Sequence, residues 1–200
     1  MFRELPTLSR LLQHLQKIPY LASKNVYRVA EHFLRLKPEQ ISQLCAVLSE
    51  ITQNIEQCST CFAWKERAQG CMFCFSNKRD HSIVCVVETW QELLSIEKTN
   101  GYSGVYHVLG GVISPLDGVG PEDLRISNLI ERINRGGITE VILAMNQTPE
   151  GEATIAFIAH KLRDKSITIS CLARGIPVGS SLEMVDRVTV YKALSERRPF

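Results

Sequence analysis

Four of the seven cysteines fall within residues 58–74, CSTCFAWKERAQGCMFC, as two Cys-x-x-Cys pairs. Each pair can fold as a tight turn that points two sulfurs at one place, and the intervening loop can bring the second turn opposite the first. Four thiolates then form a tetrahedral Zn²⁺ site without a position for water, so the predicted ion is structural, with one per chain. The predicted ligands are Cys58, Cys61, Cys71 and Cys74. Gly70, just before the second pair, is expected to ease that turn.

Disulfide bonds and redox catalysis are the alternatives for these thiols. The N-terminal stretch MFRELPTLSRLLQHLQ lacks the apolar core of a signal peptide, and no apolar run is long enough to cross a bilayer. The chain is therefore expected in the cytoplasm, away from membranes, where thiols stay reduced. One Cys-x-x-Cys pair alone would fit a thioredoxin-like redox site, but two close together favour a metal. The other cysteines, which fall on apolar faces and are expected in the core, are Cys45, Cys85 and Cys171.

Short apolar runs alternate with helical patterns beyond residue 80. SIVCVV, VYHVL, EVILAM and ITISCL predict strands, whereas TWQELLSIEKT, LRISNLIERINR and EGEATIAFIAHKLRD have helical spacing. This alternation predicts βαβ units and an α/β fold with a mostly parallel sheet covered by helices on both faces. Sites in such sheets lie at the carboxyl ends of the strands, which here are Glu88, 107–111, 146–152 and 173–179.

The residues before the cysteines predict three amphipathic helices. Apolar residues recur at spacings of three and four in LSRLLQHLQKI, KNVYRVAEHFLRL and EQISQLCAVLSEITQNI, and prolines separate the three segments. We therefore expect four parts. They are a helical module at 1–56, a cysteine module at 57–80, an α/β domain at 81–175 and a C-terminal segment at 176–200.

Several stretches resemble the RecR family of bacterial recombination mediators. They are CVVE at a strand end, YHVLGGVISPLDGVGPEDLRI, EVILAMN followed by EGEAT, and LARGIPVGSSLEMVD. The order of parts also agrees with that family: a helix-hairpin-helix module, a four-cysteine zinc finger, a Rossmann-like Toprim domain and a C-terminal segment. The resemblance implies a DNA-binding protein of DNA repair that works with RecO, and with RecF as a further candidate, to load RecA onto single strands. It also implies a homo-oligomer, a ring-shaped tetramer.

Toprim enzymes hold Mg²⁺ with an acidic residue after one strand and an Asp-x-Asp pattern after another. Glu88 matches the first position, but Asn146 and Thr148 stand where the two aspartates would be. Because Mg²⁺ favours anionic oxygen, we expect a degraded site and no enzymatic activity. The alternative is a Mg²⁺-dependent Toprim nuclease, primase or topoisomerase-like enzyme.

Two acidic residues follow in the next predicted helix. The resemblance implies that Glu150 and Glu152 belong to the surface that faces RecO. A structural role is equally open, because acidic residues in a first turn favour the helix dipole, with Thr148 as the N-cap and Pro149 as the first helical residue.

The stretch IPYLASK, residues 18–24, corresponds to the DNA-binding hairpin of the family. A Gly-x-Gly turn there exposes backbone N–H groups to a phosphate, but this chain has Tyr20 and Ala22 in place of the glycines. The basic Lys24 and Arg28, four residues apart on one helical face, match family positions that contact DNA. A solvated basic face is the alternative. We expect DNA binding to depend on these side chains and on assembly more than on the hairpin backbone.

Overall fold

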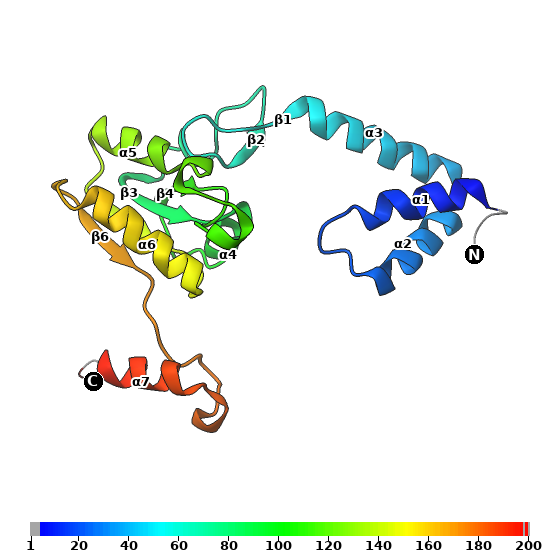
Figure 1. Cartoon of the computed structure of the whole chain (residues 1–200). Coiled ribbons are helices and arrows are strands. Elements are labelled where there is room, and N and C mark those ends of the chain that lie inside the picture. The colour runs from blue at the N-terminus through cyan, green and yellow to red at the C-terminus, as the bar shows by residue number, and fades with distance from the viewer. Residues whose placement is uncertain (1–4, 198, 200) are drawn as a thin grey trace. The chain divides into compact units, whose positions relative to one another are not determined.

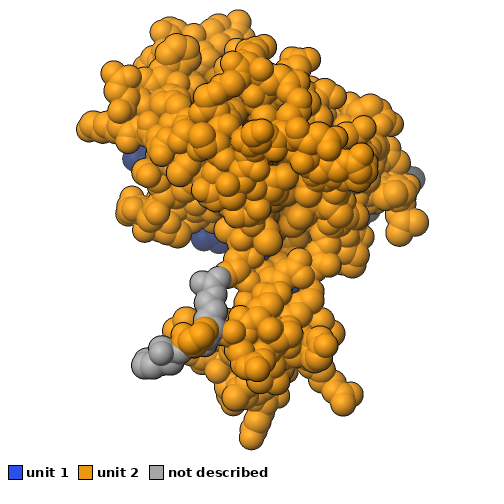
Figure 2. Space-filling model, turned by 90° about the vertical axis from the view of Figure 1, so that its left-hand side faces the viewer, with its two compact units in different colours: residues 1–55 blue, residues 56–200 orange. Residues whose placement is uncertain are grey.

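The structure is a computed structural model that describes residues 5–197 and 199. It divides into two compact units, residues 1–55 and 56–200 (Figure 1, Figure 2). Across the described part of the chain, every helix is too short or too polar to cross a membrane. Each unit is described separately below.

The first unit contains the three predicted helices, α1 (Pro6–Gln16), α2 (Ser23–Arg35) and α3 (Pro38–Asn54). A proline stands in the first turn of both α1 and α3, where the missing N–H costs no helical hydrogen bond. Helices α1 and α2 pack together through apolar side chains at helical spacing, of which the buried ones are Leu12, Leu15, Val26 and Ala30. Helix α3 is described throughout, and none of its residues is buried.

The second unit is built on a parallel four-stranded sheet in the order β4-β3-β5-β6. The strands are β3 (Asp80–Val87), β4 (Gly104–Val108), β5 (Glu140–Leu143) and β6 (Thr168–Cys171). Their connections carry α4 (Trp90–Glu97), α5 (Ile126–Asn134) and α6 (Pro149–Leu162). The predicted α/β fold with a parallel sheet is therefore confirmed, and each predicted strand and helix of this part is present.

The two faces of the sheet have different covers. Along β3, Val84 and Val86 pack with residues of α5 and α6, whereas Cys85 and Val87 pack with α4 and with the cysteine module. This alternation follows from the two-residue period of a strand. The cysteine module contains β2 (Trp64–Glu66), which pairs with β1 (Ile55–Gln57) just before it. This module, together with α4, thus covers one face of the sheet.

The remaining segments of the second unit are irregular. Between β4 and α5, the Gly-rich loop contains two short 3-10 helices, η1 (Pro115–Asp117) and η2 (Pro121–Asp123). After β6 the chain runs through η3 (Leu182–Met184) into α7 (Arg187–Ser195). Asp186 caps α7 by accepting hydrogen bonds from the backbone N–H groups of Val188 and Thr189, each at 3.0 Å. None of the residues of α7, all of them described, is buried.

Candidate functional site

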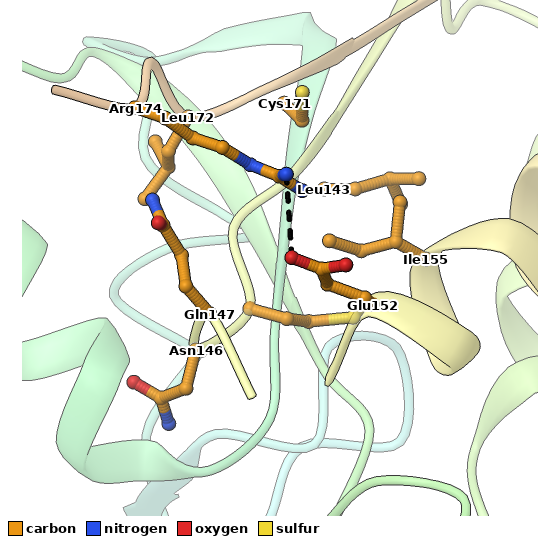
Figure 3. Close-up of a pocket in the computed structure, with 9 residues that line it drawn as sticks. Leu143, Asn146, Gln147, Glu152, Ile155, Cys171, Leu172 and Arg174 are labelled. Atoms are coloured by element: carbon orange, nitrogen blue, oxygen red, sulfur yellow. Dashed lines mark ion pairs between the residues drawn. The ribbon is translucent and has the colours of Figure 1, made fainter. Parts of the chain in front are cut away.

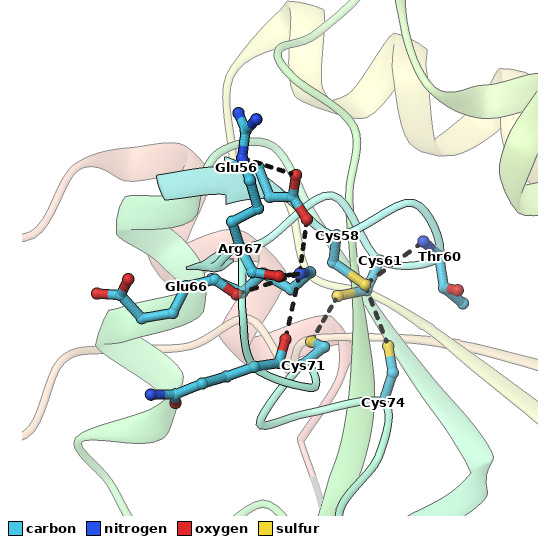
Figure 4. Close-up of polar contacts among 10 residues, drawn as sticks. Glu56, Cys58, Thr60, Cys61, Glu66, Arg67, Cys71 and Cys74 are labelled. Carbon is cyan, nitrogen blue, oxygen red and sulfur yellow. Dashed lines mark hydrogen bonds and ion pairs between the residues drawn. The ribbon is translucent and has the colours of Figure 1, made fainter. Parts of the chain in front are cut away.

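The four cysteine sulfurs converge on one point (Figure 4). All four Sγ atoms lie within 4.8 Å of one another, with 3.5 Å between Cys61 and Cys71 and 4.0 Å between Cys58 and Cys74. Tetrahedral Zn²⁺ with bonds of about 2.3 Å to sulfur places its ligands roughly 3.8 Å apart. The cluster can therefore hold a metal ion, and its four sulfurs would leave no coordination position for water or substrate.

Backbone hydrogen bonds shape the first cysteine turn. The N–H of Phe62 donates to the carbonyl of Cys58 at 2.9 Å, and the N–H of Cys58 donates to the carbonyl of Ala63 at 2.8 Å. The left-handed residue of this turn is Phe62, with φ of 60°. Gly70 has no such φ, so the expectation that glycine eases the second turn was wrong. A Cβ there would only touch the ring of Phe75 at an ordinary 3.5 Å.

Burial favours a bound cation at this cluster. Cys58, Cys61 and Cys71 are almost inaccessible to solvent. Hydrogen bonds that the Cys61 thiol donates to Cys71 and Cys74, together with burial, raise its pKa. Four thiolates cannot share such a space without a positive charge between them, whereas a metal ion would stabilise all four.

The strained Phe62 also attaches the cysteine module to the sheet. Its ring meets the ring of His107 edge-on with centroids 5.4 Å apart, and the guanidinium of Arg125 lies 5.1 Å above it. The backbone N–H of Val108 donates to the carbonyl of Cys61 at 2.9 Å. The pattern of cysteines does not predict this contact, because it depends on residues from two other elements.

His107 is completely buried beneath that contact. Its Nε2 donates to the carbonyl of Arg125 at 2.9 Å, and among the described residues its Nδ1 has no hydrogen-bond partner. Burial lowers the pKa of His107 to about 4, so the ring is neutral at pH 7. Among the described residues, the group of side chains that could hold a metal ion consists of the four cysteines and does not include His107.

Two of the three other cysteines are not core residues. Cys85 is buried in β3, but Cys45 and Cys171 are exposed. Cys45 lies on α3, none of whose residues is buried by the described part of the chain, and Cys171 ends the edge strand β6. The expectation of three core cysteines was therefore wrong for these two, because apolar neighbours in sequence do not guarantee a covering element.

Glu88 and Asn146 meet at the carboxyl ends of β3 and β5. The backbone N–H of Asn146 donates to Oε1 of Glu88 at 2.5 Å, and its amide Nδ2 donates to Oε2 at 2.9 Å. Glu88 is only 8% exposed. Both carboxylate oxygens are thus engaged by one neutral residue, at the position where a Toprim metal site requires a second acidic ligand.

A second glutamate joins this pair, and the sequence analysis did not single it out. Oε1 of Glu92 accepts from Nδ2 of Asn146 at 3.4 Å, and Oε2 accepts from the N–H of Thr89 at 2.8 Å. Burial alone would raise the pKa of Glu92, but hydrogen bonds from Thr89 and Asn146 outweigh it and lower the pKa. The capping-box pattern of Thr89 followed by Glu92 was the signal in the sequence.

The turn before α6 fixes Asn146. Thr148 caps the helix by accepting from the N–H of Gly151 at 3.1 Å, and Pro149 is the first helical residue, both as predicted. Gly151 is buried, and a Cβ built on it would lie 2.1 Å from the carbonyl oxygen of Asn146. Only glycine allows this close approach, so the backbone of Asn146 depends on Gly151.

Glu150 and Glu152 have different surroundings. Glu152 forms ion pairs with Arg174 and Lys192, each at 3.2 Å, and the pair with Arg174 borders a small pocket (Figure 3). Arg174 follows β6 and Lys192 lies on α7, and the sequence did not connect either of them to this helix. Glu150 is half-buried in the first turn, and its carbonyl accepts from the hydroxyl of Thr154 at 2.7 Å.

In the first unit, Lys24 and Arg28 lie on the exposed side of α2. The preceding turn joins α1 to α2, with Pro19 followed by Tyr20 and a hydrogen bond of 3.3 Å from the N–H of Leu21 to the carbonyl of Ile18. Tyr20 has φ of 65°, and Ala22 is the N-cap of α2 with φ of −55°. The first glycine position of the hairpin thus keeps the left-handed conformation without glycine.

Comparison with known proteins decides the family. The Toprim domain family matches residues 82–173, and the family described as RecR, C-terminal, matches residues 175–198. The chain is 43% identical over 197 residues to the recombination protein RecR of Trichlorobacter lovleyi, with 98% of each chain covered. The chain belongs to the RecR family. A further RecR, from Pelobacter propionicus, is 46% identical over 190 residues, with 95% of each chain covered.

Membership of the RecR family confirms the resemblance seen in the sequence. Glu88 and Asn146 lie within the region that the Toprim family matches. Arg174 directly follows that region, and Lys192 lies within the region that the RecR, C-terminal, family matches. The four-part division of the chain remains a prediction, as do the roles of the individual residues.

Proposed function

We propose that the chain is a DNA-binding recombination mediator of DNA repair. It acts in the cytoplasm with RecO, and with RecF as a further candidate, to load RecA onto single-stranded DNA. Near full-length similarity to proteins named recombination protein RecR supports this role. The observation that carries the non-enzymatic part of the proposal is the pairing of Asn146 with Glu88.

A Toprim enzyme needs several carboxylates around Mg²⁺ to stabilise phosphoryl transfer. Here a neutral amide fills the place of an acidic ligand and binds the remaining carboxylate. Supercoiled DNA incubated with the protein and Mg²⁺ or Mn²⁺ should remain uncut. Strand cleavage that disappears in a Glu88→Gln variant would instead establish the enzyme.

DNA contact is assigned to Lys24 and Arg28, whose exposed charges can each neutralise a phosphate. Replacement of both by alanine should lower affinity and flatten the plot of log K against log salt by about 1.4 units on single strands. The matched control replaces Lys161 of α6 and Arg163, the C-cap residue of that helix, which removes the same charge from the second unit. Equal affinity and salt slope for the Lys24/Arg28 variant and the native protein would refute the assignment.

Partner binding is assigned to the acidic start of α6. Glu150→Lys tests it best, because Glu152 already pairs with Arg174 and Lys192 of the same chain. Loss of RecO capture by Glu150→Lys, with normal DNA binding, would support the assignment. Unchanged capture would assign Glu150 to the helix dipole alone.

We also propose a homo-oligomer, with a ring-shaped tetramer as its form. Large apolar side chains are exposed on α3 and on the C-terminal segment, which a second copy could cover. On α3 they are Leu44, Val47, Leu48 and Ile51, and on the C-terminal segment they include Val188, Tyr191 and Leu194 of α7. Sedimentation at micromolar concentration should show a tetramer, and a monomer would contradict the ring.

The metal is proposed to be one structural Zn²⁺ per chain, held by the four cysteines. The all-sulfur ligand set and the sulfur spacing support zinc over a hard cation.

A further inference from the structure

The turn between α1 and α2 carries a tyrosine in an unfavourable backbone conformation. Pro19 followed by a residue with positive φ is the pattern of a type II turn, which selects glycine or asparagine at the second central position. Tyr20 stands there with φ of 65°. A side chain with a Cβ is strained at such a φ, so the conformation must be maintained by the rest of the turn, in which the N–H of Leu21 donates to the carbonyl of Ile18.

Packing within the unit does not explain this tyrosine. The side chain of Tyr20 is 101% exposed, so it buries no surface against the described residues around it. Phe62, the other aromatic residue with positive φ, differs because His107 and Arg125 cover its ring. With this exposure, Tyr20 presents both faces of its ring to solvent. It belongs to the turn that joins α1 to α2 (Figure 1).

The surroundings of Tyr20 are positively charged. Residues 17–28, KIPYLASKNVYR, contain three basic side chains and no acidic one. Lys17 precedes the turn, Lys24 and Arg28 follow it, and all three are exposed. An exposed aromatic ring among cations is the composition of surfaces that bind single-stranded nucleic acid, where bases stack on the ring and phosphates meet the cations.

We propose that Tyr20 stacks on an unpaired base of single-stranded DNA while Lys24 and Arg28 contact the adjoining phosphates. In a duplex both faces of each internal base are already stacked, so this contact favours single strands and strand ends. The inference rests on the proposed DNA binding of the first unit and adds the part of the DNA that it recognises.

Two substitutions separate the effect of the aromatic ring from the effect of an apolar side chain. Tyr20→Phe retains the aromatic face, whereas Tyr20→Leu keeps an apolar side chain without it. The probes are oligothymidylate and an abasic oligonucleotide of equal length, which carries the same phosphates but no bases. Fluorescence anisotropy on the full chain should give native-like binding of oligothymidylate by Tyr20→Phe and on the order of tenfold weaker binding by Tyr20→Leu.

On the abasic strand the native protein and Tyr20→Leu should bind equally, and the salt slope should be the same for both. Equal binding of oligothymidylate by the native protein and Tyr20→Leu would overturn the inference while leaving the DNA-binding proposal intact. No binding of either strand by the native protein would overturn both.

Tyr20→Gly excludes misfolding as the cause. Glycine relieves the positive φ, so this variant should melt at or above the temperature of the native protein and yet bind oligothymidylate as weakly as Tyr20→Leu. Native-like affinity of Tyr20→Gly would show that the turn backbone, and not the ring, contacts the DNA.

Discussion

Asn146 holds the carboxylate of Glu88 from two directions, through its backbone N–H at 2.5 Å and its amide Nδ2 at 2.9 Å. The two residues are 58 positions apart and meet because β3 and β5 are neighbours in the sheet. The side-chain bond depends on an amide, since a carboxylate at position 146 could not donate to Glu88. One neutral residue thus replaces the cation that such a carboxylate pair would require.

An acidic residue at position 146 should therefore make the stability of the fold depend on a divalent cation. In Asn146→Asp the new carboxylate faces Glu88 and Glu92, which costs a hydrogen bond and adds repulsion of about 2 kcal/mol in total. Thermal unfolding without metal should show a lower Tm than the native protein, and millimolar Mg²⁺ should restore part of the loss.

The matched control is Gln147→Glu, which adds the same charge at the adjacent exposed residue. The Tm of this variant should be close to that of the native protein, and Mg²⁺ should change neither value. A native Tm that rises with Mg²⁺ would mean that Glu88 already binds the ion.

Gly151 should tolerate no side chain. A Cβ would lie 2.1 Å from the carbonyl oxygen of Asn146, so the backbone before α6 would have to move. Gly151→Ala should lower the free energy of unfolding by about 1–3 kcal/mol, measured by urea denaturation. Gly175→Ala is the control, because nothing lies within 4 Å of its Cβ position. Similar losses in both variants would exclude the close approach as the cause.

The cysteine cluster should bind one Zn²⁺ that the fold requires. Cys61→Ser removes a buried ligand, so the purified protein should contain little zinc and melt at least ~10 °C lower. Elemental analysis and calorimetry measure the two effects. Cys171→Ser, at an exposed cysteine outside the cluster, should keep both the metal and the Tm. A stable, zinc-free Cys61→Ser protein would contradict a structural metal.

The sequence predicted those features that depend on local patterns. Strands and helices followed from apolar spacing, the cap at Thr148 from its neighbours, and the cysteine set from its ligand spacing. The sequence patterns did not predict contacts between elements that are distant in the chain. The docking of Phe62 against His107 depends on the path of β4, and the pairing of Glu152 with Arg174 depends on how the chain leaves β6.

Tyr20 shows a different limit. The sequence shows Tyr20 and Ala22 in place of the two hairpin glycines, and this alone does not establish that the turn keeps its left-handed residue. The structure retains the left-handed residue because Pro19 and the hydrogen bond between Ile18 and Leu21 define the turn. The replacement therefore changes what the turn presents to solvent more than how it folds.

His107 should make the fold sensitive to acid. Its pKa is lowered to about 4 by burial, whereas an unfolded histidine titrates near 6.5. Between these values the unfolded chain binds a proton that the folded chain does not, so stability is complete above pH 6.5 and declines as the pH falls toward 4. The decline from this one group approaches about 1.4 kcal/mol per pH unit.

His107→Gln keeps a donor for the carbonyl of Arg125 but cannot titrate, so its free energy of unfolding should fall less steeply over this range. His160→Gln, at an exposed histidine, should retain the native slope in urea denaturation between pH 4 and 7. Parallel pH profiles for His107→Gln and the native protein would show that other groups cause the acid sensitivity.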